Sequence, residues 1–96
     1  MPTTNTLSWN KNPEPDVAKY NIYRNLGAAP TKVPGNLFAS VPATTTTFVD
    51  TVTVGGDYFY AITAVDTSNN ESALSASVDK VVDLVPPSAP TGLTVV

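Results

Sequence analysis

The sequence predicts an all-β, immunoglobulin-like sandwich of about seven short strands. Two observations support this fold class. Turn signals recur about every 8 to 12 residues, which is the spacing of strands in a sandwich. The chain is also rich in threonine, including the unbroken run 44–47, and contains nine prolines, a composition that favours strands and turns. No stretch has the 3.6-residue periodicity of a helix, and 96 residues suffice for one domain.

The first expected strand, residues 6–10, precedes a proline-rich turn. Leu7 and Trp9 alternate with polar residues in it, so both side chains should face the core. The next segment contains Pro13 and Pro15, which cannot lie in the interior of a paired strand. Residues 12–16 are therefore expected to form a turn.

The second expected strand, residues 17–24, directs Tyr20 and Ile22 inward. The following segment, residues 26–36, contains two glycines and two prolines and should be a loop. Two shorter strands follow at 37–41 and 46–51, the latter with one inward aromatic side chain, Phe48.

Residues 58–66 give the clearest strand pattern in the chain. Tyr58, Tyr60, Ile62 and Ala64 fall on one face of it, and a Gly-Gly turn precedes it. A polar loop is expected at 67–72, and residues 74–82 alternate loosely as a further strand. The residues expected to form the structural core are Trp9, Tyr20, Ile22, Phe48, Tyr58, Tyr60, Ile62 and Ala64.

The composition excludes several classes of function. A net charge of −3 with only five basic residues argues against binding to nucleic acid, which needs a basic face. The chain has no cysteine and no histidine, so thiol chemistry, a Ser-His-Asp triad and imidazole metal ligands are absent. No apolar run approaches the length of a membrane span, and no signal-peptide pattern follows Met1. We expect no enzymatic activity, no cofactor, no metal and no membrane contact.

One loop offers several oxygen ligands, from Asp66, Asn69, Asn70 and Glu71. A calcium loop would place its carboxylates at alternating positions, and this loop does not. A solvated turn is the favoured interpretation, with calcium as the alternative.

These elements together resemble a fibronectin type III module of the bacterial type. The resemblance rests on LSW (7–9), on PDVxxYxIYR (15–24), on YxYxITAVD (58–66) and on the C-terminal PxxPxxLxV (87–95). It implies that Tyr58 forms a tyrosine corner, whose hydroxyl bonds to backbone upstream. Tyr23 and Phe59 fall on the outward phase, where packing across the sheet is favoured over an exposed aromatic strip for ligands.

The resemblance has one departure, because the segment that looks like the family's first strand lies at the C-terminal end of this chain. We expect a module at 1–85 without its own first strand and a first-strand-like segment at 86–96. Leu93 and Val95 of that segment should pair beside residues 6–10 of another copy of the chain or of an adjacent similar module. Pairing within the same molecule and an unpaired tail are the alternatives.

The expected function is therefore that of a non-catalytic structural module that assembles head to tail by strand donation. The alternative is a glycan- or protein-binding accessory module of a secreted multidomain enzyme or surface protein. The resemblance implies an extracellular or cell-surface location. A glycan or protein ligand is compatible with the sequence, but no residue pattern identifies one.

Overall fold

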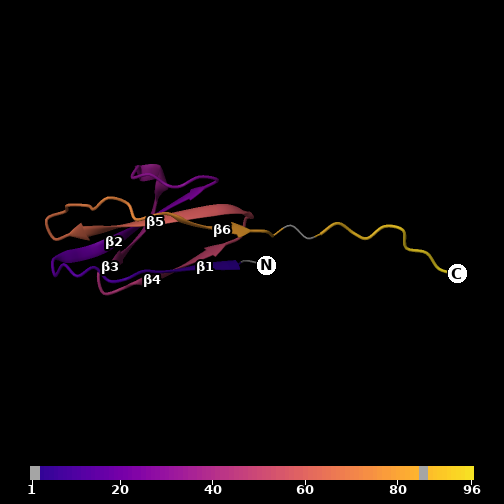
Figure 1. Cartoon of the computed structure of the whole chain (residues 1–96), viewed down its shortest axis with the longest axis horizontal. Helices are drawn as coiled ribbons and strands as arrows, with labels where there is room; N and C mark the ends of the chain where they lie inside the picture. The colour runs from indigo at the N-terminus through magenta and orange to yellow at the C-terminus, as the bar shows by residue number, and fades with distance from the viewer. Residues whose placement is uncertain (1–2, 85–86) are drawn as a thin grey trace.

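The computed structural model describes residues 3–84 and 87–96. The strands, all within residues 3–82, form two antiparallel β-sheets that face each other (Figure 1). The described strands are β1 (Thr3–Ser8), β2 (Val17–Leu26), β3 (Leu37–Pro42), β4 (Thr47–Val52), β5 (Gly56–Asp66) and β6 (Val78–Val82). The described residues contain no α-helix, only a single 3-10 turn, η1 (Pro34–Asn36), before β3. The predicted all-β class is confirmed, with six strands in the described part of the chain.

The two sheets differ in size. The larger has the strand order β3-β2-β5-β6, and the smaller consists of β1 and β4 alone. In the small sheet, β1 and β4 pair in an uninterrupted register from Thr3 opposite Val52 to Ser8 opposite Thr47. One edge of β1 is therefore paired with β4, and its other edge has no neighbouring strand among the described residues.

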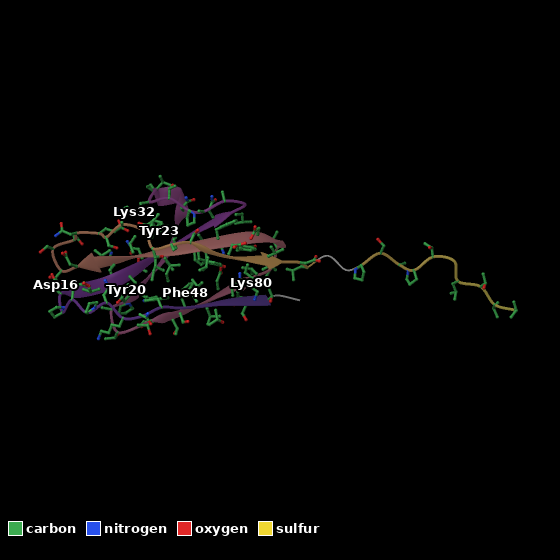
Figure 2. All side chains as sticks on the ribbon, in the orientation of Figure 1. Asp16, Tyr20, Tyr23, Lys32, Phe48 and Lys80 are labelled. Carbon is green, nitrogen blue, oxygen red and sulfur yellow. The ribbon has the colours of Figure 1, made fainter. Side chains whose placement is uncertain are left out.

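The hydrophobic core lies between the sheets. Its buried residues come from β2, β4, β5 and β6, and partly buried side chains from β1 and β3 pack against them. The buried cluster consists of Ile22, Val52, Tyr58, Tyr60 and Val82. The partly buried side chains packed against it are Leu7, Trp9, Ala39, Val41, Phe48, Ile62 and Leu84. Figure 2 shows Tyr20 from β2 and Phe48 from β4 among the side chains of the two facing sheets.

The last predicted strand, 74–82, is regular only from Val78 onward. Before that point the chain still follows the edge of β5, but serine side chains replace part of the ladder. The backbone N–H of Ile62 donates to Ser75 Oγ at 3.0 Å, and that of Ala64 donates to Ser72 Oγ at 2.9 Å. Serine hydroxyls compete with backbone groups in this way, which explains the loose alternation of the segment.

The outer face of the large sheet is also covered, which the alternation of β2 did not indicate. Tyr23 is only 4% exposed, so the alternative of an exposed aromatic strip is wrong for this residue, and its burial agrees with the favoured interpretation of packing on the sheet. The chain after β5 folds back over the face, and the Tyr23 hydroxyl donates to Glu71 Oε2 at 2.5 Å. Tyr23 is thus buried by a segment distant in sequence.

The C-terminal segment extends away from the sandwich (Figure 1). Residues 87–96 form no described strand, and the Leu93 and Val95 side chains are 95% and 94% exposed. The proposed boundary between residues 85 and 86 lies outside the described residues. Gly92 has φ +77°, a left-handed conformation that glycine adopts without steric cost.

Candidate functional site

The free edge of β1 borders an apolar groove on the described surface. The groove has a volume of about 210 Å³ and opens between the two sheets. Side chains of β1, of the centre of β5 and of the segment entering β6 form its walls. Its lining residues are Leu7, Ser8, Trp9, Tyr60, Ala61, Ile62, Ser75, Ala76 and Val78. The site therefore combines an unpaired strand edge with an apolar depression beside it.

Trp9 marks one end of this groove. Its backbone N–H donates to the carbonyl of Thr46 at 3.0 Å, and its ring meets the Tyr20 ring edge to face at 5.5 Å. Packing on Tyr20 fixes the indole against the core, where such aromatic pairs are favourable. The indole Nε1, however, is buried and donates to no acceptor among the described residues. A buried donor without an acceptor is uncommon in folded proteins and calls for an explanation.

Lys80 lies at the opposite end of β1. Its ammonium group on β6 donates to the carbonyl of Thr4 at 3.3 Å, so one backbone group of β1 already has a partner. Figure 2 shows Lys80 at the end of the sandwich from which the C-terminal segment leaves. Charged lysines at sheet edges commonly limit unwanted pairing. The free part of the edge therefore begins beyond Thr4, towards Trp9.

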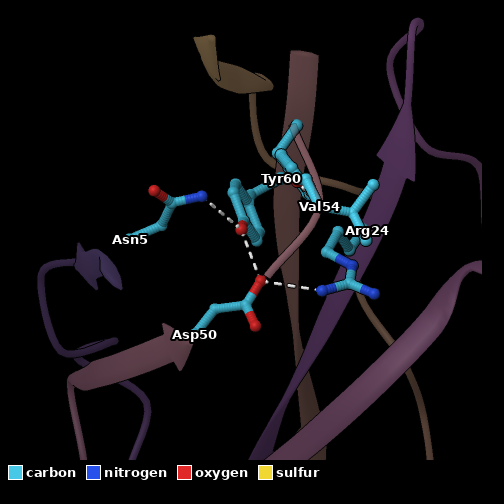
Figure 3. Close-up of polar contacts among 6 residues, drawn as sticks. Asn5, Arg24, Asp50, Val54 and Tyr60 are labelled. Carbon is cyan, nitrogen blue, oxygen red and sulfur yellow. Dashed lines mark hydrogen bonds and ion pairs between the residues drawn. The ribbon is translucent and has the colours of Figure 1, made fainter. Parts of the chain in front are cut away.

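A polar network in the core fixes β1 to the large sheet (Figure 3). Asn5 Nδ2 donates to the Tyr60 hydroxyl at 2.9 Å, and that hydroxyl donates to Asp50 Oδ2 at 2.5 Å. Arg24 Nη1 forms an ion pair with the same carboxylate oxygen at 2.9 Å. Asn5 and Asp50 are only 2% and 3% exposed, so the bonds that join them to Tyr60 are shielded from water.

Burial controls the acidity of this network. Desolvation, and then the hydrogen bond to Asp50, raises the pKa of Tyr60 to about 12. Tyr60 therefore remains a neutral hydrogen-bond donor at physiological pH. Asp50 is compensated by Arg24, whose guanidinium also lies over the Phe38 ring at 3.8 Å. These contacts serve to hold the sheets together.

Tyr58 makes the contact that the family resemblance implies for a tyrosine corner. Its hydroxyl donates to the carbonyl of Val54 at 2.6 Å, four residues upstream. The side chain is 4% exposed, and its ring also lies 5.4 Å from the Arg24 guanidinium. Tyr58 thus closes the turn between β4 and β5.

A second polar cluster lies on the outer face of the large sheet. Glu71 Oε2 accepts hydrogen bonds from Tyr23, from Thr63 at 2.6 Å and from Asn21 at 3.2 Å. The bonds from Thr63 and Tyr23 lower the pKa of Glu71, and the charge of Lys32 contributes in the same direction. The cluster attaches the segment after β5 to the sheet, so Glu71 has a structural role that its position in a polar loop did not reveal.

The oxygen-rich loop after β5 satisfies its own polar groups. Asp66 Oδ1 accepts from the backbone N–H of Ser68 and of Asn70, each at 2.9 Å, and these contacts form a compact turn. The backbone and side-chain hydrogen bonds from Asn70 lower the pKa of Asp66. Among the described residues no three acidic or histidine side chains are grouped to hold a metal ion.

The structure brings most of the sequence-selected core residues together. Tyr20, Ile22, Tyr58 and Tyr60 are at most 4% exposed. Trp9, Phe48, Ile62 and Ala64 are half-buried, with Trp9 and Ile62 beside the groove. Leu93 and Val95 do not contact this core, and their pairing with a second copy stays a prediction.

Part of this chain is similar to a known enzyme. The chain is 46% identical, over 63 residues, to an amylopullulanase from Thermoanaerobacter thermohydrosulfuricus. The match covers 62% of this chain but spans only 4% of the length of that enzyme. No family model and no solved structure matches the chain. Separately, none of the helical structure in residues 3–84 and 87–96 is long and apolar enough to cross a membrane.

Proposed function

We propose that this chain is a non-catalytic accessory module, of the fibronectin type III kind, from an extracellular multidomain glycoside hydrolase. The similarity to amylopullulanase carries the proposal, because a module-sized segment of that large enzyme matches most of the chain at 46% identity. The facing antiparallel sheets and the Tyr58 contact to Val54 support the kind of module.

The state of the acidic residues supports a non-catalytic role. Glycoside hydrolysis generally uses two carboxyl groups that flank the substrate. Asp50 is buried in an ion pair with Arg24, and Glu71 accepts three hydrogen bonds from the sheet. Asp50 and Glu71 are therefore both engaged in holding the fold.

The placement of the aromatic side chains favours a positioning role over sugar binding. All four tyrosines are at most 4% exposed, and Trp9 is held edge-on by Tyr20. Ligand sites usually present aromatic faces in a concave surface, whereas the tyrosine rings are buried in the core or, for Tyr23, under the segment after β5. We therefore assign the module to the spacing and support of neighbouring domains.

A segment exchange in the amylopullulanase tests this role. Replacing its matching segment by this chain should preserve pullulan hydrolysis and thermal stability, whereas deleting the segment should lower the melting temperature with little change in kcat on soluble pullulan. An exchanged enzyme as unstable as the deletion would contradict the proposal.

Sugar binding is tested on the isolated 96-residue chain by affinity electrophoresis in gels containing pullulan or amylopectin. The positioning role predicts the same mobility with and without polysaccharide. Retardation that vanished on Trp9→Ala, in a variant shown by circular dichroism to be folded, would replace the positioning role by glucan binding.

A further inference from the structure

The free edge of β1 and the exposed C-terminal segment have complementary properties. The edge presents backbone groups without a neighbouring strand beside an apolar groove. The segment presents Leu93 and Val95, two nearly fully exposed apolar side chains at the two-residue spacing of a strand face. A strand with one apolar face is the kind of partner that such an edge accepts.

We propose that residues 93–96 of one molecule form a short antiparallel strand on the free edge of β1 in a second copy of this chain, with Leu93 and Val95 in the groove. The groove walls supply apolar contacts from Leu7, Ile62 and Val78. The left-handed Gly92 allows the chain to turn immediately before the new strand begins.

Trp9 gives the groove a preformed wall. Its side chain lines the groove that an incoming strand would occupy. The ring is held edge to face against Tyr20, with ring centroids 5.5 Å apart, so this wall does not have to be ordered when a strand binds.

The direction of the chain favours a second copy over the molecule's own tail. β6 ends beside the start of β1, as the bond from Lys80 to the Thr4 carbonyl shows, and the segment leaves the sandwich at that end. To run antiparallel to its own β1, the segment would have to return to the Trp9 end and reverse again. A second copy ahead of the first presents its Trp9 end to the segment directly, and antiparallel pairing then needs no reversal.

The arrangement is head to tail, so each molecule donates one strand and accepts another. Such a heterologous contact does not close on itself unless the rotation between copies forms a ring, and the expected product is an open chain of copies. Lys80 at Thr4 limits the new ladder to the part of β1 nearer Trp9. This inference concerns contact between copies and does not depend on the proposed enzyme context.

The first experiment measures the mass of the full chain across a concentration range by sedimentation velocity. The expected result is a series of multiples of 10.0 kDa that grows with concentration. The double variant Leu93→Asp, Val95→Asp should be monomeric and should melt at the temperature of the wild type diluted to its monomer, because these side chains are almost fully exposed in their own molecule. A wild-type chain that is monomeric at every concentration would overturn the inference.

The double variant also distinguishes the alternatives. Oligomers that persist in it would show that another surface causes assembly. A wild type that is itself monomeric but melts at a higher temperature than the double variant would show that the segment pairs within its own molecule. Either result would reject donation between copies.

The second experiment adds a synthetic peptide of residues 87–96 to the double variant Leu93→Asp, Val95→Asp, whose own C-terminal segment should no longer bind the groove. Trp9 is the chain's single tryptophan, so its fluorescence reports occupation of the groove. The peptide should shift the emission saturably, and a control peptide with both aspartate substitutions should bind at least tenfold more weakly. Equal effects of the two peptides, or none from either, would contradict the proposed site.

Discussion

β5 and β1 differ in how their edges are paired and in how many of their side chains are buried. β5 has eleven residues and pairs with β2 on one edge and β6 on the other, and both of its faces contain buried side chains. β1 has six residues and pairs only with β4, and Asn5 is its single fully buried residue. The same architecture thus contains one strand paired on both edges and one strand with a free edge.

The difference indicates which part of the molecule provides stability and which part can provide contacts. Hydrophobic stabilisation scales with apolar area removed from water, so β5 and its neighbour β2 should dominate the free energy of unfolding. β1 depends instead on the polar network through Asn5 and on partly buried side chains. A strand held in this way can keep a free edge without weakening the rest of the sandwich.

The largest expected effect comes from shortening a core side chain beside β5. Ile22 on β2 lies opposite Ile62 and is 0% exposed. Ile22→Ala should cost about 2–5 kcal/mol of unfolding free energy, a large part of the roughly 5–15 kcal/mol typical of a domain. Leu7→Ala in β1 should cost less, because Leu7 is only half-buried. Urea denaturation measures both losses of stability. Equal losses would contradict the inference that β5 and β2 contribute more to the free energy of unfolding than β1 does.

The next effect concerns the network that connects the two strands. Tyr60→Phe removes the hydroxyl between Asn5 and Asp50, leaves buried polar groups unpaired and should cost about 1–3 kcal/mol. Tyr58→Phe is the matched control, since its hydroxyl bonds one backbone carbonyl, and should cost about 1 kcal/mol. A Tyr60→Phe variant no less stable than the control would show that the network does not hold β1.

The same residue predicts an alkaline transition. The folded-state pKa of Tyr60 is about 12, above the ordinary value of 10.0, so the folded protein retains a proton that the unfolded chain releases. This contribution is complete below pH 10 and is lost as the pH rises towards 12, on the order of 2 kcal/mol. Denaturation at successive alkaline pH values measures it. Tyr60→Phe should lack the loss, and a loss of the same size in that variant would assign it to other groups.

The fold was predictable because its information is local. Alternation in β5, the two prolines before β2 and the Gly-Gly turn before Tyr58 each determine backbone conformation within a few residues. The boundaries of β1 and β6 were less well predicted. Ser72 and Ser75 replace part of the β6 ladder with side-chain bonds, which an alternation pattern does not distinguish from a strand.

The candidate site was only partly predictable, since its contacts join distant residues. Asn5 and Tyr60 are 55 positions apart, and Tyr23 and Glu71 are 48 apart. A single sequence does not show which polar residues meet across such separations. Trp9 was selected as a core residue from its alternation, but its unpaired Nε1 and its place beside a groove depend on the tertiary packing.

A smaller effect should follow from weakening the contacts between the outer face of the large sheet and the segment after β5 that covers it. Glu71→Gln keeps the shape but removes the charge that Tyr23, Thr63 and Asn21 solvate, and should cost about 1 kcal/mol at neutral pH. Because the folded-state pKa of Glu71 lies below its ordinary value of 4.5, its contribution is present above that pH and disappears as the pH falls through the folded-state value. The variant and the wild type should therefore converge in acid.

Thermal melts between neutral and acidic pH measure this convergence. Glu14→Gln is the matched control, because Glu14 lies in the exposed turn and accepts one bond from Asn12. The comparison of the strands would be weakened if Glu71→Gln and the control behaved alike, since the outer cover of β5 would then contribute nothing measurable.

The smallest effect should be a gain in stability where β5 meets β6. Burial and the nearby Asp79 carboxylate raise the pKa of Asp57, so at neutral pH two like charges oppose each other across these strands. Asp79→Asn should raise the melting temperature at neutral pH. The folded protein binds this proton more tightly than the unfolded chain does, so wild-type stability falls as the pH rises through the range above 3.8, and the gain should vanish below that range.

A matched control separates this local repulsion from the overall negative charge. Asp16→Asn also removes one negative charge, but from the turn at the end of the sandwich opposite Lys80 (Figure 2). If the net charge of −3 were responsible, both variants would gain equally in melting temperature. A gain confined to Asp79→Asn would instead locate the weakness at the β5–β6 pairing. Even the most enclosed strand of the molecule would then carry one contact that opposes folding.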